Sequence, residues 1–543
     1  MFFDGLIVVI VRRWKETMLS HVAALLLCIA VNVGVATASS PFRVLLTPWC
    51  DNSIRVRVQL ASMPASTAAA QAALWKNLGE KNLTDLPGAL DIRPEAVCNP
   101  ASPVVVTNTT GSASQGNLHV EVTEDGAIRA SRVDTGEVLF TANAQFTENP
   151  VTPSPPADGR EGYLTSNLSV TASATTKNEI LYGLGQGNWT EEGGCPDIDP
   201  KKGARIVPLE RNGQAVDLMQ RKFHVSIPVL FSTAGYVFLM NQPGYGLVNV
   251  GDYGVGGAEW SLTAALYIDF WISALPKGVS APNFGVLYSQ YADATGHAPP
   301  LRDDAMLFWQ SRNRYKSSAI ALSVAQRYQQ LDLPVGVLVI DFKNQVNDGD
   351  FTPNPACFPS VKDLSSDVRT AINATTMFSF WPEVLTNAQE YDALLQKGCL
   401  INPDLGGLAI DATIPECRAF IWEEYLKPRY YDQGVSAYWL DETDGEGTGG
   451  GDGNFGYNNS YGPPAAYSNM WVNDWLRLFT EPVANMNVPN EPPLALTRGV
   501  WAGGQRNGIV LWSSDIRSTF EQLASQVPQG VHASMSGIPY WSK

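Results

Sequence analysis

Between residues 291 and 543, apolar segments of strand length alternate with segments of helical length. Residues 335–340 are continuously apolar, residues 318–331 have helical periodicity, and residues 376–381 are apolar again. Continuous apolar strands separated by helices are typical of a parallel sheet covered on its outer side. The pattern therefore predicts an α/β fold, with a (β/α)8 TIM-type barrel over residues 291–543.

Each predicted strand ends in a polar or aromatic side chain. In a TIM barrel the carboxyl ends of the strands meet on one face, and active sites lie there. Alone, each residue has an ordinary structural explanation, such as a helix cap, a core position or a surface ion pair. Together they predict one active site, lined by Trp309, Asp341, Trp381, Asp441, Arg498, Asp515 and Trp541.

One strand is especially informative. Residues 434–440 are apolar and aromatic, and three acids follow within four residues, Asp441, Glu442 and Asp444. The glycine-rich segment 445–456 comes next. A buried strand that delivers a carboxylate to the top of a barrel suits catalysis, so Asp441 is a candidate catalytic residue. Our working hypothesis is that it is the nucleophile of a retaining α-glycosidase. The alternative is a solvated acidic loop after an ordinary strand.

The preceding part of the chain has β character. Residues 54–60 and 118–122 alternate apolar and polar side chains, and residues 264–272 have a similar rhythm. Short strands separated by regular turns predict an N-terminal β-sandwich domain over residues 41–290, with the proline-rich residues 150–156 as a surface loop.

The segment 183–188 resembles a phosphate-binding glycine loop. No helical pattern opens after it, so the dinucleotide interpretation fails. A tight turn that lets the backbone approach a ligand is the better interpretation.

The N-terminus predicts entry into the secretory pathway. Residues 1–40 contain positive charges, an apolar run over residues 22–35 and the small-residue pattern Ala36-Thr37-Ala38, as in a signal peptide or signal anchor. Glycosylation sequons, which suit a secreted glycoprotein, occur at Asn82, Asn108, Asn167, Asn188, Asn373 and Asn458. We therefore expect a secreted, extracellular protein, with membrane association only if the segment is an uncleaved anchor.

The cysteines agree with an oxidising compartment. Cys28 lies in the leader, and six others remain, Cys50, Cys98, Cys195, Cys357, Cys399 and Cys417. We predict disulfides with the pairing left open, the alternative being free buried thiols. Because CxxC is absent and the five histidines are scattered, we expect no metal and no cofactor.

Composition restricts the partners. The net charge is −16, and no Lys/Arg block is long enough to follow a phosphate backbone. We therefore exclude nucleic acid as a partner and regard a neutral sugar as compatible with the charge.

Several motifs, in order along the chain, resemble glycoside hydrolase family 31, the α-glucosidase and α-xylosidase family. Residues 291–297 (YADATGH) and 308–315 (FWQSRNRY) resemble its entry into the barrel. Residues 439–442 (WLDE) resemble its nucleophile strand, and residues 502–506 (AGGQR) through 512–515 (WSSD) its acid/base segment. Residues 536–541 (SGIPYW) match as well, so the resemblance spans about residues 41–543.

The resemblance implies a role for each site residue. Asp441 would attack the anomeric carbon, and Asp515 would protonate the leaving oxygen and then activate water. Asp341 and Arg498 would hydrogen-bond the hydroxyls of the sugar. The aromatic walls of the substrate site would be Trp309, Trp381, Trp439 and Trp512. The implied substrate is an oligo- or polysaccharide with terminal α-linked glucose or xylose, and no cofactor is required.

The sequence departs from the family pattern in two places. Residues 441–444 read DETD, where the common α-glucosidase form is DMNE; this is closer to α-xylosidases or transglucosylases. After Lys543 the family usually continues with an eighth strand, a substrate-binding histidine and C-terminal β domains. We accordingly expect a truncated chain whose incomplete barrel has about seven strands, with open edges that lower stability and activity.

Two alternatives to hydrolysis stay open. An α-transglucosylase would use Asp441 and Asp515 in the same way and pass the sugar to an acceptor sugar. A truncated sugar-binding protein would keep the pocket without turnover. Retention of both carboxylates argues against the binding protein, and the expected truncation argues for it.

Overall fold

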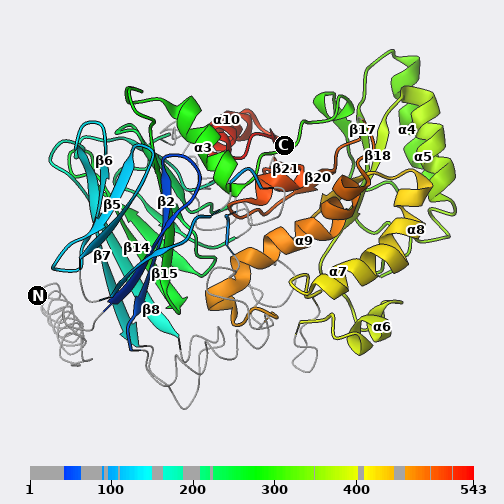
Figure 1. Ribbon diagram of the computed structural model, residues 1–543. Helices are drawn as coiled ribbons and strands as arrows, with labels where there is room; N and C mark the ends of the chain where they lie inside the picture. The colour runs from blue at the N-terminus through cyan, green and yellow to red at the C-terminus, as the bar shows by residue number, and fades with distance from the viewer. Residues whose placement is uncertain are drawn as a thin grey trace, which may run out of the picture. The chain divides into compact units, whose positions relative to one another are not determined.

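The computed structural model describes residues 42–62, 88–90, 96–98, 100–107, 110–148, 163–186, 208–220, 224–347, 349–401, 409–444, 459–489, 491–516 and 518–543 (Figure 1). The predicted signal segment, the proline-rich loop, Cys195 and the sequons at Asn82, Asn108, Asn188 and Asn458 lie outside these residues. Within the described ranges, the helices are too short or too polar to cross a membrane.

The N-terminal half of the described chain forms two antiparallel sheets. The first has the order β3-β1-β2-β15-β12-β11-β9 and the second the order β10-β13-β14-β8-β7-β6-β5-β4. The strands are β1 (Phe42–Pro48), β2 (Ser53–Leu60), β3 (Val104–Thr107), β4 (Gly111–Gln115), β5 (Leu118–Val122), β6 (Ile128–Arg132), β7 (Val138–Glu148), β8 (Leu164–Ala172), β9 (Leu181–Gly183), β10 (Ala215–Asp217), β11 (Val229–Ser232), β12 (Tyr236–Met240), β13 (Gly246–Val250), β14 (Ala258–Ala265) and β15 (Ile268–Ala274). The two sheets contact each other through aromatic rings. Phe238 of β12, in the first sheet, stacks on Trp260 of β14, in the second, with ring centroids 5.3 Å apart.

Two details of this half differ from the sequence-based predictions. The predicted strand 264–272 is divided: β14 ends at Ala265 and β15 begins at Ile268, in the other sheet. The glycine turn approaches protein rather than a ligand. A Cβ atom on Gly185, whose φ is +82°, would lie 1.9 Å from the Val225 carbonyl oxygen. Glycine is required there because the neighbouring backbone leaves no room.

The C-terminal half contains a seven-stranded parallel sheet in the sequential order β16 to β22. Its strands are β16 (Trp309–Gln310), β17 (Val337–Ile340), β18 (Thr375–Phe380), β19 (Ala437–Leu440), β20 (Leu494–Thr497), β21 (Ile509–Trp512) and β22 (Trp541–Ser542). Every residue of β17 to β21 is buried, as a parallel sheet covered on both faces requires. The strand that was predicted to end at Trp309 begins there instead, after the 3₁₀ turn Asp304–Met306.

Alternate side chains of these strands belong to two separate apolar clusters. Val337 and Val339 of β17 join the cluster that also contains Trp439 and Trp512, whereas Leu338 and Ile340 join the cluster formed with the helices. The first cluster, here called the interior cluster, consists of Ala305, Val337, Val339, Met377, Ala437, Trp439, Leu494, Leu496, Val510 and Trp512, with Leu301, Trp309 and Tyr540 at its margin. The parallel strands therefore curve around a shared, packed interior, as barrel strands do.

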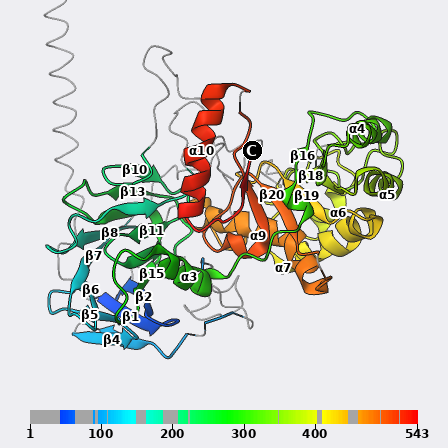
Figure 2. The ribbon, with the colours of Figure 1, turned by 90° about the horizontal axis from the view of Figure 1, so that it is seen from above.

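Helices cover the outer side of the parallel strands (Figures 1 and 2). They are α4 (Ser318–Gln330), α5 (Val361–Ile372), α6 (Tyr391–Gln396), α7 (Pro415–Ile421), a π-helical turn (Trp422–Leu426), α8 (Lys427–Arg429), α9 (Pro464–Met486) and α10 (Phe520–Met535), with short 3₁₀ turns at Tyr431–Gln433 and Gly504–Asn507. Helix α3 (Phe284–Thr295) packs instead on β12 and β15 of the first antiparallel sheet. Side-chain caps explain several starts: Ser317, Ser360 and Thr519 each accept a backbone N–H at the first turn.

The antiparallel sheets and the parallel sheet are joined by polar contacts. The Gln505 side chain donates to the Thr295 hydroxyl and the Gly296 carbonyl at the end of α3, both at 2.8 Å. The Ser536 hydroxyl accepts the Gly185 N–H at 2.7 Å. These contacts hold the connection between β20 and β21 against the end of α3, and the end of α10 against the glycine turn.

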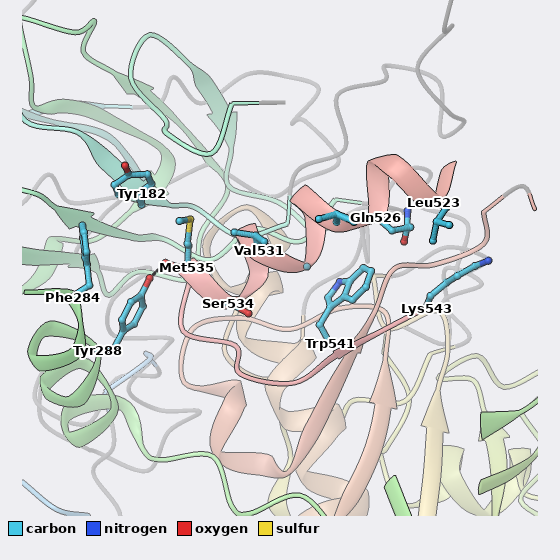
Figure 3. Close-up of a pocket in the computed structure, with 12 residues that line it drawn as sticks. Tyr182, Phe284, Tyr288, Leu523, Gln526, Val531, Ser534, Met535, Trp541 and Lys543 are labelled. Atoms are coloured by element: carbon cyan, nitrogen blue, oxygen red, sulfur yellow. Dashed lines mark hydrogen bonds between the residues drawn. The ribbon is translucent and has the colours of Figure 1, made fainter. Parts of the chain in front are cut away.

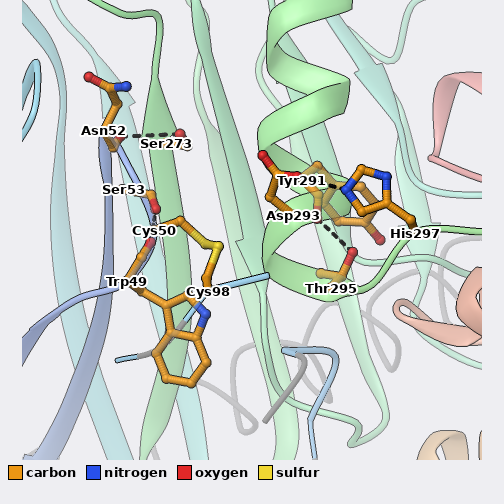
Figure 4. Close-up of a disulfide and its surroundings, with 10 residues drawn as sticks. All are labelled: Trp49, Cys50, Asn52, Ser53, Cys98, Ser273, Tyr291, Asp293, Thr295 and His297. Carbon is orange, nitrogen blue, oxygen red and sulfur yellow. Dashed lines mark hydrogen bonds and ion pairs between the residues drawn. A yellow bond between two sulfur atoms is a disulfide. The ribbon is translucent and has the colours of Figure 1, made fainter. Parts of the chain in front are cut away.

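The described cysteines form two disulfides, Cys50–Cys98 and Cys399–Cys417. Figure 4 shows the first beside the indole of Trp49, close to α3, where Asp293 pairs with His297. The prediction that cysteines pair is thus confirmed for four of them, and Cys357 is a free thiol. Among the described sequons, Asn373 is exposed, whereas Asn167 is half-buried within β8.

We predict that replacing Cys399 and Cys417 together by serine lowers the free energy of unfolding by about 2–4 kcal/mol. The disulfide closes a loop across 18 positions, and its loss restores chain entropy to the unfolded state. Denaturant unfolding monitored by tryptophan fluorescence measures the change. Cys357→Ser is the matched control and should have a far smaller effect; equal effects in both variants would contradict a stabilising disulfide.

Candidate active site

Four predicted site residues follow directly after four neighbouring parallel strands. Asp341 follows β17, Trp381 follows β18, Asp441 follows β19 and Arg498 follows β20. The register pairs Phe380 with Leu440 and Leu440 with Thr497, so the next residues on these strands come level with one another. Asp515 comes three residues after β21. The carboxyl ends of the sheet therefore gather these side chains at one edge.

Asp441 is the centre of the contacts. Its Oδ2 accepts the Trp381 Nε1–H at 3.3 Å, and its Oδ1 accepts the backbone N–H of Glu442 at 2.8 Å. Arg498 Nη1 lies 3.4 Å from Oδ1. These neighbours fix both oxygens of a carboxylate whose side chain is only 15% exposed.

The acids at this edge influence one another. Burial raises the pKa of Asp441, the positive charge of Arg498 opposes this rise, and the negative charges of Asp444 and Asp515 add to it. Burial also raises the pKa of Asp341 to about 6; the Phe342 N–H opposes the rise, and the charges of Asp441 and Asp515 add to it. The three acids that the sequence singled out therefore lie within electrostatic reach of one another. Asp515 is solvent-exposed, whereas the other two are enclosed.

The tryptophans divide into two groups. Trp381 borders Asp441 and stacks on Phe342 with ring centroids 5.4 Å apart. Trp439 and Trp512 belong to the interior cluster and contact each other edge to face at 5.0 Å, so they form the packed layer below the strand ends. Trp439 lies two residues before Asp441 on the same strand.

Two predicted strand-end residues are not brought to the carboxylates. Trp309 pairs with Val337 at the start of β17, four residues before Asp341, and its Nε1 donates to the Ala305 carbonyl. Trp541 packs against the apolar cluster that the strands form with the helices, and its Nε1 donates to Gln186 Oε1 at 2.7 Å. Both predictions assumed that the aromatic residue ends its strand, whereas each one begins a strand of two residues.

The structure adds residues that the strand-end pattern missed. Phe342 stacks on Trp381, and Asp444 is fully buried with its Oδ1 2.8 Å from Arg498 Nη2. Asp444 was visible in the sequence only as part of an acidic run, which does not reveal its ion pair.

Backbone conformation also marks this region. Lys343, Glu442 and Ser514 have positive φ values, and each lies within two residues of one of the three acids. Non-glycine residues in this conformation cost on the order of 1 kcal/mol or more, and such residues cluster at functional sites.

A separate cavity of about 610 Å³ lies away from these acids (Figure 3). It is lined by Tyr182, Phe284, Tyr288, Leu523, Gln526, Val527, Gly530, Val531, Ser534, Met535, Trp541 and Lys543. Its walls are mostly aromatic and aliphatic and contain no Asp or Glu side chain, so this cavity does not hold the carboxylates that the sequence singled out. Within the described ranges, His, Cys, Asp and Glu side chains form no group of three or more suited to a metal ion.

The chain has recognisable relatives. Residues 299–543 match the family described as glycosyl hydrolases family 31, TIM-barrel domain. An uncharacterized family 31 glucosidase, ORF2, from Pseudescherichia vulneris is 26% identical over 92% of this chain and 88% of its own. An α-xylosidase from Saccharolobus solfataricus is 28% identical over 68% of this chain and 48% of its own, so the chain spans about half the length of that relative. The solved xylosidase from Aspergillus niger, 20% identical, has a TM-score of 0.71 over 93% of this chain and 72% of its own, which establishes a shared fold.

We predict that Asp341→Asn becomes more stable relative to the unsubstituted protein as the pH rises from about 4 to about 7. The pKa of Asp341 is raised in the folded state, so its contribution to stability is present at low pH and is lost as the carboxyl ionises. A shift of about two pKa units corresponds to about 3 kcal/mol. Asparagine does not ionise, so the variant does not lose this stability as the pH rises.

Urea unfolding of both proteins at several pH values measures the difference. Asp432→Asn, at an exposed position, controls for the removal of one negative charge. A stability difference between Asp341→Asn and the unsubstituted protein that is independent of pH would contradict the raised pKa.

Proposed function

This chain belongs to glycoside hydrolase family 31, and from that membership we propose that it is a retaining glycosidase for terminal α-linked xylose or glucose on oligo- or polysaccharides. The observation that carries the proposal is the group formed by Asp341, Asp441, Asp515 and Arg498 at the ends of adjacent parallel strands. The enclosed carboxylates Asp341 and Asp441 near Arg498, together with the exposed Asp515, suit a neutral, polyhydroxylated substrate that becomes positively charged in the transition state.

In the proposed mechanism Asp441 attacks the anomeric carbon and forms a glycosyl-enzyme. The glycosidic oxygen leaves with a proton from Asp515. Asp515 then takes a proton from water, whose oxygen attacks the same carbon and releases Asp441. Asp441 accepts two N–H donors while its charge is partly shared with Arg498, which fixes its direction of attack.

Substrate binding is assigned to the neighbours of these acids. Asp341 and Arg498 hydrogen-bond sugar hydroxyls, and Trp381 provides an aromatic wall against Phe342. Trp439 and Trp512 support this wall from the interior cluster. Two relatives named xylosidases favour α-xylosides as the first substrates to test.

The architecture and location follow the same proposal. We propose that residues 41–290 form an N-terminal β-sandwich domain and that residues 291–543 form the catalytic barrel domain. We propose that the protein enters the secretory pathway through residues 1–40, and the two disulfides support an oxidising destination.

We predict that the protein releases p-nitrophenol from its α-xyloside or α-glucoside, and that Asp441→Ala lowers kcat by roughly 10⁴-fold or more because the nucleophile is removed. Asp432→Ala, a surface acid, is the control. Initial product examined by NMR should be the α-anomer. A β-anomer would contradict retention.

Azide then separates the two catalytic roles. With Asp441→Ala, azide should replace the carboxylate and give the β-glycosyl azide. With Asp515→Ala, azide should attack the glycosyl-enzyme and give the α-glycosyl azide. Transfer to an added sugar in place of water would establish transglycosylation instead, and a folded protein that binds sugar without turnover would establish a binding protein.

A further inference from the structure

Arg498 is shared between two carboxylates. Its Nη2 lies 2.8 Å from Asp444 Oδ1, and its Nη1 lies 3.4 Å from Asp441 Oδ1. The Arg498 side chain is 3% exposed and that of Asp444 is fully buried, whereas Asp441 keeps 15% exposure. The shorter contact of Arg498 is thus with Asp444, the more deeply buried of the two acids.

An unshared arginine would behave differently beside a carboxylate. Guanidinium and carboxylate groups favour close, bidentate pairing, especially where water is excluded. Such a pair would occupy the lone pairs of Asp441 and reduce its ability to attack carbon. Something must therefore hold Arg498 back, and Asp444 is placed to do so.

We propose that Asp444 is a positioning residue that holds the Arg498 guanidinium in its own ion pair, so that Asp441 stays available as the nucleophile. The proposal rests on the proposed function, because it assigns a purpose to Asp444 within that reaction. Asp444 acts through Arg498 and touches no reacting atom.

The backbone explains why this acid reaches Arg498. Glu442 has φ +52°, which turns the chain directly after Asp441. The Thr443 hydroxyl donates to the Leu440 carbonyl at 2.7 Å and lies 3.0 Å from the Thr497 hydroxyl. This turn fixes the loop to β20, so that Asp444 lies against the residue that follows Thr497.

The electrostatics give the expected direction of a pH effect. Burial raises the pKa of Asp441 most, Arg498 and the Glu442 N–H lower it, and the charges of Asp444 and Asp515 raise it further. Asp341, at the end of β17, also interacts electrostatically with Asp441. Removing the charge of Asp444 takes away one raising influence and releases Arg498 toward Asp441. Both changes lower the pKa of Asp441.

The test is Asp444→Asn, which keeps the shape of the side chain and removes its charge. We expect kcat to fall about 10- to 100-fold, as for partners that orient a catalytic group. At the same time the acidic limb of the kcat/KM profile should move to lower pH, by about one unit. Asp444→Glu, which restores the charge, should return the limb toward its original position.

Asp269→Asn is the matched control. Asp269 forms a buried ion pair with Arg55 inside the first antiparallel sheet, 3.0 Å between Arg55 Nε and Oδ1. Both asparagine variants remove the carboxylate from a buried arginine pair, and both should lower thermal stability. Only Asp444→Asn should shift the acidic limb of the kcat/KM profile to lower pH.

A second measurement does not depend on turnover. Carboxyl ¹³C NMR of aspartate-labelled protein reports the pKa of Asp441, with the signal assigned by its loss in Asp441→Asn. A lower pKa of Asp441 in Asp444→Asn supports the proposal even if the unsubstituted protein lacks glycosidase activity, which would overturn only the proposed function. An unchanged pKa and an unmoved limb, with glycosidase activity present, would overturn the positioning role alone.

Discussion

The site depends on the burial of several carboxylates around the guanidinium of Arg498. Asp441 and Asp444 both contact Arg498, and the negative charge of Asp441 contributes to the raised pKa of Asp341. Removing these acids from water is unfavourable, and the charge of Arg498 offsets part of that cost. Ionised carboxylates gathered at this edge suit a substrate whose anomeric carbon becomes positive in the transition state. The cost in stability and the benefit in catalysis therefore have the same origin.

That charge arrangement requires rigid support. The interior cluster places the edge-to-face rings of Trp439 and Trp512 directly below the strand ends, so Asp441 stands on a strand that has little freedom to shift. On the other side, Gln505 and Ser536 join the parallel sheet to α3 and to the glycine turn of the first antiparallel sheet. The antiparallel sheets thus act on the site through the backbone they hold, without supplying any of the three acids.

Much of the fold and of the site could be predicted from the sequence, because the hydrophobic periodicity and the residues at strand ends are local properties of the chain. Asp341, Asp441 and Arg498 follow apolar runs, and parallel strands bring such positions together. Boundaries were less predictable. Helices α9 and α10 continue through Pro482 and Pro528, since tertiary packing outweighs the local cost of proline.

Other features depend on contacts that no local pattern encodes. The pairing of Arg498 with Asp444 joins segments 54 residues apart, and the disulfide partners were likewise open. Trp309 and Trp541 were misplaced for a different reason: each begins a strand of two residues, where a local pattern does not distinguish the beginning from the end.

In the proposed reaction, the carboxyl of Asp341 would carry a second proton besides the one that Asp515 would transfer. With a pKa of about 6, this carboxyl would accept hydrogen bonds from sugar hydroxyls above that pH and would donate one below it. Asp441 must be ionised to attack, whereas Asp341 needs only a matching partner on the sugar. Protonation of Asp341 therefore acts chiefly on binding, and protonation of Asp441 on the chemical step. The acidic limbs of KM and kcat consequently report different carboxyls in the same small group, although each carboxyl shifts the other.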